Sequence, residues 1–164
     1  MDNIGSSTML FGMSKNYTVD LIAKWMMTMD RRGQIYFIPW IVDRHWMLVL
    51  VMMRGMTIIL DPFKNHKSPP IITEVMEKAY AQCLENEYIG TFTKLVRGSC
   101  PKQPESHECG YYVLRYIYDL VNAPNRAEVI KKKWFDKKQF NVKEDLLPLQ
   151  SDWLSRLMPF VYEI

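Results

Sequence analysis

Two apolar runs with a glycine between them constrain the fold of this chain more than any other feature. The first run is WMLVLVMM at 46–53 and the second is MTIIL at 56–60, with an Arg-Gly pair between them. Short apolar runs on either side of a glycine-containing turn are typical of a β-hairpin. We therefore predict two adjacent antiparallel strands, with His45 and Asp61 at the open end of the hairpin.

The length of the turn decides whether His45 and Asp61 face the same side of the sheet. Side chains alternate between the faces of a strand, so the sum of paired residue numbers must be even if both are to share a face. A two-residue turn gives an odd sum. A three-residue loop at 53–55 pairs Met52 with Met56 and gives an even sum, with its glycine in the left-handed conformation. This register predicts that Asp61 lies diagonally across from the His45 ring.

The other elements follow from apolar periodicity and from the positions of proline, glycine and capping residues. We expect Thr18 to cap the first helix, Pro39 to stop the first strand and Gly98 to end the last one. The expected helices cover 19–30, 71–85, 110–121, 126–134 and 149–161, and the expected strands outside the hairpin cover 34–38 and 91–96.

Length and composition fit a single domain. The chain has 164 residues, of which 48% are hydrophobic and 24% charged, which is enough for one core and too little for two. A helix followed by strands and then helices predicts an α+β domain over 17–164. We expect residues 1–16 to form a flexible lead-in, because they show no sustained apolar period.

Charge and cysteine content narrow the class of protein. A net charge of +3 does not indicate an obligate nucleic-acid binder, and the basic run at 131–133 is more typical of a solvated helix face than of a phosphate-binding patch. Three cysteines cannot form a complete disulfide set, and their spacing does not suit a metal knuckle. With no signal-peptide pattern at 1–13 and no apolar run long enough to cross a bilayer, we expect an intracellular protein without a membrane span.

Cys109 is the best candidate for a nucleophile. It stands directly before the helix predicted from Gly110 onward, where the helix dipole favours a thiolate and the first backbone N–H groups are unpaired. Gly110 lets a substrate backbone approach without meeting a Cβ. A thiol with an ordinary pKa near ~8.5 also needs an imidazolium partner, and His45 is the candidate base. Gln103, six residues earlier, offers a side-chain amide for an oxyanion.

Each of these residues also has an ordinary structural explanation. A histidine before an apolar strand is more often structural, a buried cysteine beside an apolar helix is usually inert, and Asp-Pro after a strand is usually a turn. The order His, Asp, Gln, Cys is the informative property. This order excludes papain-like enzymes that keep the chain order of papain itself, in which the cysteine precedes the histidine.

The sequence segments around these residues resemble those of a known family. HWMLVLV, ILDPF and CPKQPESHECGYYVLRYIYD resemble segments of the ubiquitin-like-protein-specific (SUMO-specific) cysteine proteases, most nearly the members encoded within plant DNA transposons. The resemblance covers about 36–120, and more loosely a terminal helix around Trp153. It implies a papain-like fold of the SUMO-protease type, with a small central, mostly antiparallel sheet flanked by helices.

The resemblance also implies roles for individual residues. His45 corresponds to the general base, Asp61 to its orienting acid, Cys109 to the nucleophile and Gln103 to the oxyanion donor. Trp46 corresponds to a tryptophan that clamps a diglycine tail, although packing in the core explains it equally well. His66 and His107 are interpreted as loop residues. We expect no metal and no cofactor.

The function implied is that of a thiol protease or isopeptidase of the nucleus or cytoplasm, which cleaves after the C-terminal glycine of a SUMO-like or related ubiquitin-like modifier. Only 44 residues precede His45, fewer than in the family, and neither Trp25 nor Trp40 stands where the family has a second tryptophan. We therefore expect a shortened substrate-gripping segment. The alternatives are a weakly active or inactive transposon-derived binding module and, less favoured, a nucleic-acid-associated protein using the lysines at 131–133.

Overall fold

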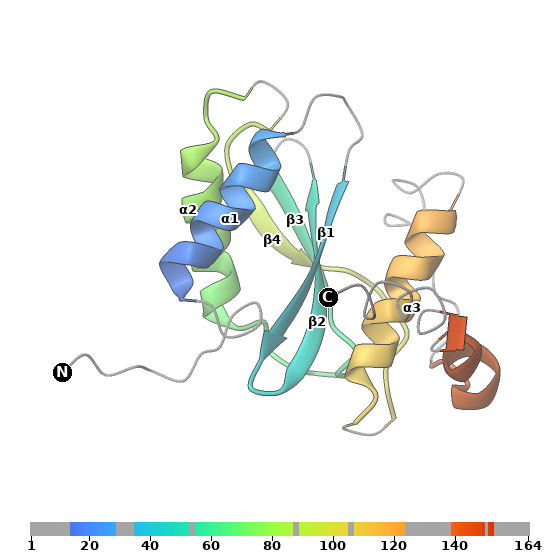
Figure 1. The fold of residues 1–164 in the computed structure, drawn as a ribbon. Coiled ribbons are helices and arrows are strands. Elements are labelled where there is room, and N and C mark those ends of the chain that lie inside the picture. Colours follow the sequence, from blue (N-terminus) through green and yellow to red (C-terminus); the bar gives the residue numbers. More distant parts are fainter. Residues whose placement is uncertain are drawn as a thin grey trace, which may run out of the picture.

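A four-stranded sheet separates two helices from a third in the computed structural model of the chain (Figure 1). Helices α1 (Lys15–Met27) and α2 (Pro70–Gln82) cover one face, and α3 (Cys109–Asn122) lies on the other. None of the helices that the structure describes is long and apolar enough to cross a membrane. The structure describes residues 14–28, 35–52, 55–86, 89–104, 107–123, 139–149 and 151–152.

The sheet is mixed and mostly antiparallel. Its strands are β1 (Ile35–Val42), β2 (His45–Met52), β3 (Met56–Leu60) and β4 (Lys94–Arg97), hydrogen-bonded in that order. The first three are antiparallel to one another, whereas β4 runs parallel to β3. The expected α+β class with a small, mostly antiparallel sheet between helices is confirmed.

The register of the β2–β3 hairpin is the one predicted from parity. Leu48 pairs with Leu60 and Val51 with Thr57, so the paired numbers have an even sum. Gly55 has a φ of +75°, and a Cβ on this residue would lie 1.6 Å from the Thr91 carbonyl oxygen. A close approach of two backbone segments in the left-handed conformation requires glycine here.

Strand β1 continues through Pro39, and the prediction that proline stops it is wrong. Pro39 pairs with Leu48 in the middle of the ladder between β1 and β2. Among the described strands, β1 lies at the edge of the sheet. A proline is tolerated on an edge strand because its missing N–H can face the open side, where no ladder bond is lost.

Helix α1 begins earlier than predicted, and Ser14 rather than Thr18 is its N-cap. The Ser14 side chain accepts a hydrogen bond from the Tyr17 backbone N–H. Thr18 is buried within the first turns, where its hydroxyl donates to the Ser14 carbonyl oxygen at 3.1 Å. The helix starts before the first apolar residue because its opening turn is polar and solvent-facing. Of the expected lead-in, residues 1–13 lie outside the described part of the chain.

The later helices agree with prediction in part. Pro70 is the first residue of α2, as expected for a proline at a helix entry, and α3 begins one residue before Gly110. A short π-helix, η2 (Val142–Leu146), was not predicted, and the Asn141 side chain caps its first N–H groups. The helix expected at 126–134, and most of the one expected at 149–161, lie outside the described residues.

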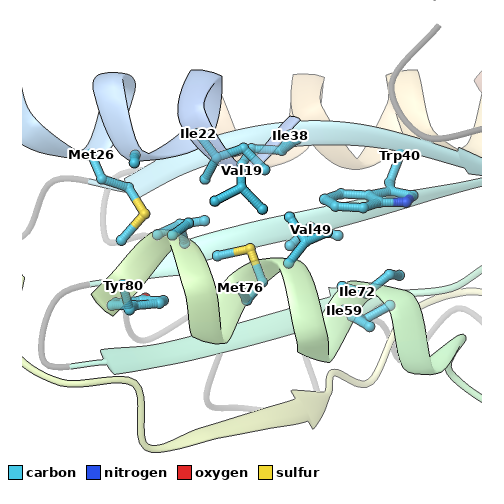
Figure 2. Packing of buried hydrophobic residues seen from close by; sticks show 14 of the residues in the cluster. Val19, Ile22, Met26, Ile38, Trp40, Val49, Ile59, Ile72, Met76 and Tyr80 are labelled. Atoms are coloured by element: carbon cyan, nitrogen blue, oxygen red, sulfur yellow. The ribbon is translucent and has the colours of Figure 1, made fainter. Parts of the chain in front are cut away.

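The two faces of β2 are buried in separate apolar cores. Met47, Val49 and Val51 belong to the core beneath α1 and α2, part of which Figure 2 shows around Ile22, Met76 and Tyr80. Leu48 and Leu50 belong to the core beneath α3. A strand buried on both faces needs a continuous rather than alternating apolar sequence, which explains the run WMLVLVMM.

Candidate active site

Three of the predicted site residues lie at the ends of secondary-structure elements. His45 is the first residue of β2, Asp61 directly follows β3, and Cys109 is the first residue of α3. Their exposed fractions are 6%, 1% and 5%, respectively. The position of Cys109 in the first turn places its sulfur near unpaired backbone N–H groups, as the sequence predicts.

The imidazole of His45 and the carboxylate of Asp61 are hydrogen-bonded. Nε2 of His45 lies 2.7 Å from Oδ1 of Asp61, the contact expected from the diagonal placement in the hairpin. The ring of Phe63 stacks on His45 with 4.3 Å between centroids and 27° between planes. With one nitrogen engaged and one face covered, the imidazole has a fixed orientation.

The pKa values of His45 and Cys109 are shifted in opposite directions. Burial lowers the pKa of His45, but the hydrogen bond with Asp61, the interaction with Cys109 and their charges raise it from 6.5 to about 9. Burial raises the pKa of Cys109, but the His45 side chain and the backbone N–H groups of Trp46 and Gly110 lower it below its usual 9.0. Together the two shifts favour a thiolate–imidazolium pair at neutral pH.

Asp61 has more partners than a single histidine. Its Oδ2 accepts hydrogen bonds from His66 Nδ1 and Arg97 Nη2, both at 2.8 Å, and its Oδ1 also accepts from the Phe63 backbone N–H at 2.8 Å. Burial raises the pKa of Asp61, but the hydrogen bonds from His45, His66 and Phe63 lower it below 3.8. The carboxylate therefore stays charged although it is enclosed.

His66 and Arg97 are the site residues that the sequence analysis missed. It interpreted His66 as a loop residue and did not consider Arg97. His66 also contacts the His45 ring edge-on, with 4.9 Å between centroids. Arg97 comes from β4, whose parallel pairing sets it beside Ile59, two residues before Asp61. The periodicity of apolar residues in the sequence does not reveal such contacts. The contact of His66 arises in an irregular loop, and that of Arg97 comes from a strand distant in the sequence.

His45, Asp61 and His66 also have the composition of a metal site, with ligand atoms that all lie within 4.8 Å of one another. The guanidinium of Arg97 already donates to the same carboxylate. It supplies the positive charge that a cation would bring, and it would repel one.

The segment that carries Gln103 is fastened to Asp61 and to α3. Gln103 is buried, and its backbone N–H donates to the Pro62 carbonyl oxygen at 3.0 Å. Lys102 Nζ donates to the Asp61 carbonyl oxygen at 2.6 Å. On the other side, the Tyr116 hydroxyl of α3 donates to the Pro101 carbonyl oxygen. These contacts hold the segment between the acid and the helix that begins at Cys109.

A groove of about 500 Å³ opens beside the sulfur of Cys109. Trp46 lines it, and a Cβ placed on Gly110 would lie 3.7 Å from Trp46 Cδ1. The indole and the first turn of α3 therefore adjoin one another on the wall of the groove. Trp46 also packs against the core beneath α3, so its two interpretations are compatible. The lining residues are Pro39, Arg44, Trp46, His107, Cys109, Gly110, Tyr111, Val113 and Leu114.

Comparison with protein families found one match over most of the chain. Residues 19–146 match a family model described as the Ulp1 protease family, C-terminal catalytic domain. A comparison with curated protein sequences found no match.

The solved structures similar to this chain have low sequence identity to it. The effector XopD of Xanthomonas campestris, bound to ubiquitin, is 18% identical, with a TM-score of 0.51 over 85% of this chain and 74% of that one. The SUMO protease Ulp1, with its catalytic cysteine oxidised to a sulfonic acid, is 22% identical, with a TM-score of 0.49 over 65% of this chain. A de-sumoylating protease is 17% identical, with a TM-score of 0.45 over 90% of this chain and 73% of that one. The match spans about half, 52%, of the Ulp1 chain.

Proposed function

The chain belongs to the Ulp1 protease family, and from this premise we propose that it is a thiol protease or isopeptidase that cleaves after the C-terminal glycine of a SUMO-like or related ubiquitin-like modifier. The observation that carries the proposal is the arrangement of Cys109, His45 and Asp61. A buried thiol at a helix N-terminus has a lowered pKa beside an imidazole of raised pKa, and a buried carboxylate holds that imidazole at 2.7 Å.

The first half of the reaction is acylation of Cys109. The thiolate attacks the carbonyl carbon of the terminal glycine, and a carbon–sulfur bond forms while the carbonyl oxygen takes up the negative charge. The backbone N–H of Cys109 and the side-chain amide of Gln103 are the donors for this oxyanion. The imidazolium of His45 gives its proton to the departing amine as the carbon–nitrogen bond breaks.

The second half is hydrolysis of the thioester. His45, now neutral, accepts a proton from a water molecule that attacks the thioester carbonyl. The carbon–sulfur bond breaks, the modifier leaves with a free carboxylate, and the thiolate–imidazolium pair is restored. Asp61 holds the ring in one orientation through both halves and stabilises its charge without becoming protonated.

The position of Trp46 and Gly110 side by side on the wall of the groove supports a preference for glycine. A tail without side chains can lie close against both, because Gly110 presents no Cβ to its backbone. A diglycine terminus of a ubiquitin-like modifier meets this requirement. We propose Trp46 and Gly110 as the residues that contact it.

We also propose a site of action, a kinship to transposon-encoded proteins and a class of modifier. The three free cysteines and a mechanism that needs a reduced thiol support a nuclear or cytoplasmic site of action. The kinship to proteins encoded in plant DNA transposons is supported by the sequence words alone. The modifier that the protein acts on is proposed as a class, not as an individual protein.

The test is covalent labelling by ubiquitin-like modifiers that carry an electrophile at the C-terminus. We expect a SUMO-like probe to add to the protein, with the adduct on Cys109 in peptide mass spectrometry. Cys109→Ala should abolish the adduct, and the matched control Cys83→Ala should keep it. Trp46→Ala should react more slowly with the probe yet keep its reactivity with iodoacetamide.

A turnover measurement tests Gln103. With a modifier that carries a C-terminal fluorogenic amide, Gln103→Ala should lower kcat by roughly 100-fold or more, the usual effect of removing an oxyanion donor. Folded protein that reacts with none of the probes would overturn the enzyme proposal and favour the binding-module hypothesis.

A further inference from the structure

We propose that Arg44 selects substrates by charge, favouring those with an acidic side chain a few residues from the scissile bond and disfavouring those with a basic one. The inference deepens the proposed function and rests on it. The observation behind it is an exposed arginine on the wall of the groove that holds Cys109, with no ion pair to any residue that the structure describes.

Arg44 occupies a strained position beside the catalytic histidine. Val42 pairs with His45 across the hairpin of β1 and β2, so Asp43 and Arg44 form a two-residue turn. Their φ values are 49° and 62°, the left-handed conformation of a turn that favours asparagine and glycine. A long, β-carbon-bearing cation is not the residue that this backbone prefers. Strain of this kind is often kept at binding sites.

No described residue neutralises Arg44. Other arginines of the described chain are paired: Arg97 with Asp61, and Arg115 with Asp119. Arg44 forms no ion pair with a residue that the structure describes, and the described residues that line the groove include no aspartate or glutamate. The positive charge at this wall is therefore available to a ligand.

The surroundings favour a carboxylate over other partners. A guanidinium binds a carboxylate through two parallel hydrogen bonds. Pro39, Val113 and Leu114 give the groove apolar walls, which reduce the water around a bound side chain and strengthen its interaction with a charge. A lysine or arginine of the substrate at the same place would meet the same charge as repulsion. Arg44 thus discriminates in both directions.

The experiment uses quenched fluorescent peptides that contain a Gly-Gly sequence, to be cleaved after the second glycine. Glu, Gln or Lys is placed at one position at a time within four residues of that bond on either side. We expect one position at which kcat/KM is about tenfold higher with Glu than with Lys, since attraction and repulsion at a partly exposed site together contribute about 1.4 kcal/mol. The ratio should fall toward one at high ionic strength.

Four variants separate charge from structure. Arg44→Glu should reverse the preference, Arg44→Gln should remove it, and Arg44→Lys should keep its sign. The matched control is Lys24→Glu, which makes the same change in net charge on an exposed residue of α1, over the opposite face of the sheet. This variant should keep the wild-type ratio.

The outcomes distinguish the inference from the proposed function. An equal Glu-to-Lys ratio in wild type and Arg44→Glu would overturn the role of Arg44 and leave the protease intact. If no peptide is cleaved, the same peptides are measured by fluorescence anisotropy on Cys109→Ala, where a charge preference that reverses in the Arg44→Glu background supports the inference without turnover. Equal binding of the Glu and Lys peptides there would overturn it.

Discussion

Two buried cysteines lie on opposite sides of the sheet, and they differ in what surrounds them. Cys83, just after α2, is fully enclosed in the core beneath α1 and α2, and its Sγ donates to the Ala23 carbonyl oxygen at 3.3 Å. Cys109 is almost as enclosed, with an exposed fraction of 5%. Burial raises the pKa of Cys83, whereas the pKa of Cys109 is lowered.

The comparison teaches that burial does not decide the chemistry of a thiol. Burial opposes the thiolate at both cysteines, and the sign of the net shift depends on whether a cation and N–H donors face the sulfur. The His45 ring and two backbone N–H groups do so at Cys109. At Cys83 burial is the only cause of its shift.

The largest expected difference between the two cysteines is in alkylation rate. At pH 6.5, iodoacetamide should modify Cys109 faster than Cys83 by roughly two to three orders of magnitude. The thiolate is the nucleophile, the pKa of Cys109 is lowered and that of Cys83 is raised, and Cys109 also lines a groove. Labelling followed across pH by peptide mass spectrometry gives both rates in one sample.

Variants around His45 sharpen this test. His45→Ala should remove most of the difference, and Asp61→Asn should reduce it less, because the imidazole remains but its orientation is lost. Similar rates at Cys83 and Cys109 in the folded wild-type protein would show that no thiolate is held at α3.

A smaller effect is expected on the way the free energy of unfolding depends on pH. The raised pKa of His45 alone stabilises the fold below pH 6.5, and this contribution is lost as pH rises toward about 9. The lowered pKa of Cys109 has the opposite slope, because the unfolded thiol keeps its proton up to its ordinary pKa of 9.0. In the pair, one proton moves from sulfur to nitrogen, so the two slopes cancel.

The free energy of unfolding of the wild type should therefore be nearly constant between pH 6.5 and 9. In Cys109→Ala the slope of the thiol is gone and the slope of His45 remains, made smaller because Cys109 no longer helps to raise the pKa of His45. Stability should therefore fall as pH rises above 6.5. Urea denaturation at several pH values measures both, with Cys83→Ala as the control that keeps the flat profile. A flat profile in Cys109→Ala would mean that His45 holds no extra proton.

The smallest expected effect separates packing from substrate contact on the α3 side of the sheet. A Cβ on Gly98 would lie 2.5 Å from Leu60 Cδ2 and 2.9 Å from Ile58 Cγ2, so Gly98→Ala should cost about 1–3 kcal/mol through overpacking. A Cβ on Gly110 would have its nearest contact at 3.7 Å, so the free energy of unfolding of Gly110→Ala should lie within about 0.5 kcal/mol of that of the wild type. Thermal denaturation compares the two.

Gly110→Ala should nevertheless react more slowly with the diglycine-tailed probe, because its methyl group would stand on the wall of the groove beside Trp46 and keep the tail at a distance. Gly98→Ala, measured at a temperature where it is folded, should react normally. If Gly110→Ala reacts like wild type, the tail does not pass over the first turn of α3.

The sequence predicted the parts of the site that depend on regular structure. Side chains alternate between the two faces of β2 and β3, and this sets His45 and Asp61 on the same face. The periodic spacing of apolar residues after Gly110 locates the helix that begins at Cys109. Local rules failed where tertiary context decides. Pro39 continues a strand because, among the described strands, β1 lies at the edge of the sheet, and α1 begins with a polar turn that shows no apolar period.

His66 and Arg97 could not be predicted for a related reason. His66 reaches Asp61 through an irregular loop. Arg97 is brought there by the parallel pairing of β4 with β3, although it is 36 positions from Asp61 in the sequence. Neither the path of such a loop nor the partner of an end strand leaves a periodic trace in a single sequence. The residues that hold Asp61 therefore depend on tertiary structure, whereas Asp61 itself can be identified from the sequence.

The proline in the middle of β1 has a consequence for how other chains can attach to this protein. An eight-residue strand at the edge of the sheet that the described residues form would ordinarily be a template for strand addition and for aggregation between edges. Pro39 interrupts the row of N–H donors on that side, so an incoming strand finds no continuous ladder. A peptide that approaches the groove past Pro39 must be held by side chains rather than by sheet extension, and the same interruption keeps neighbouring molecules from stacking edge to edge.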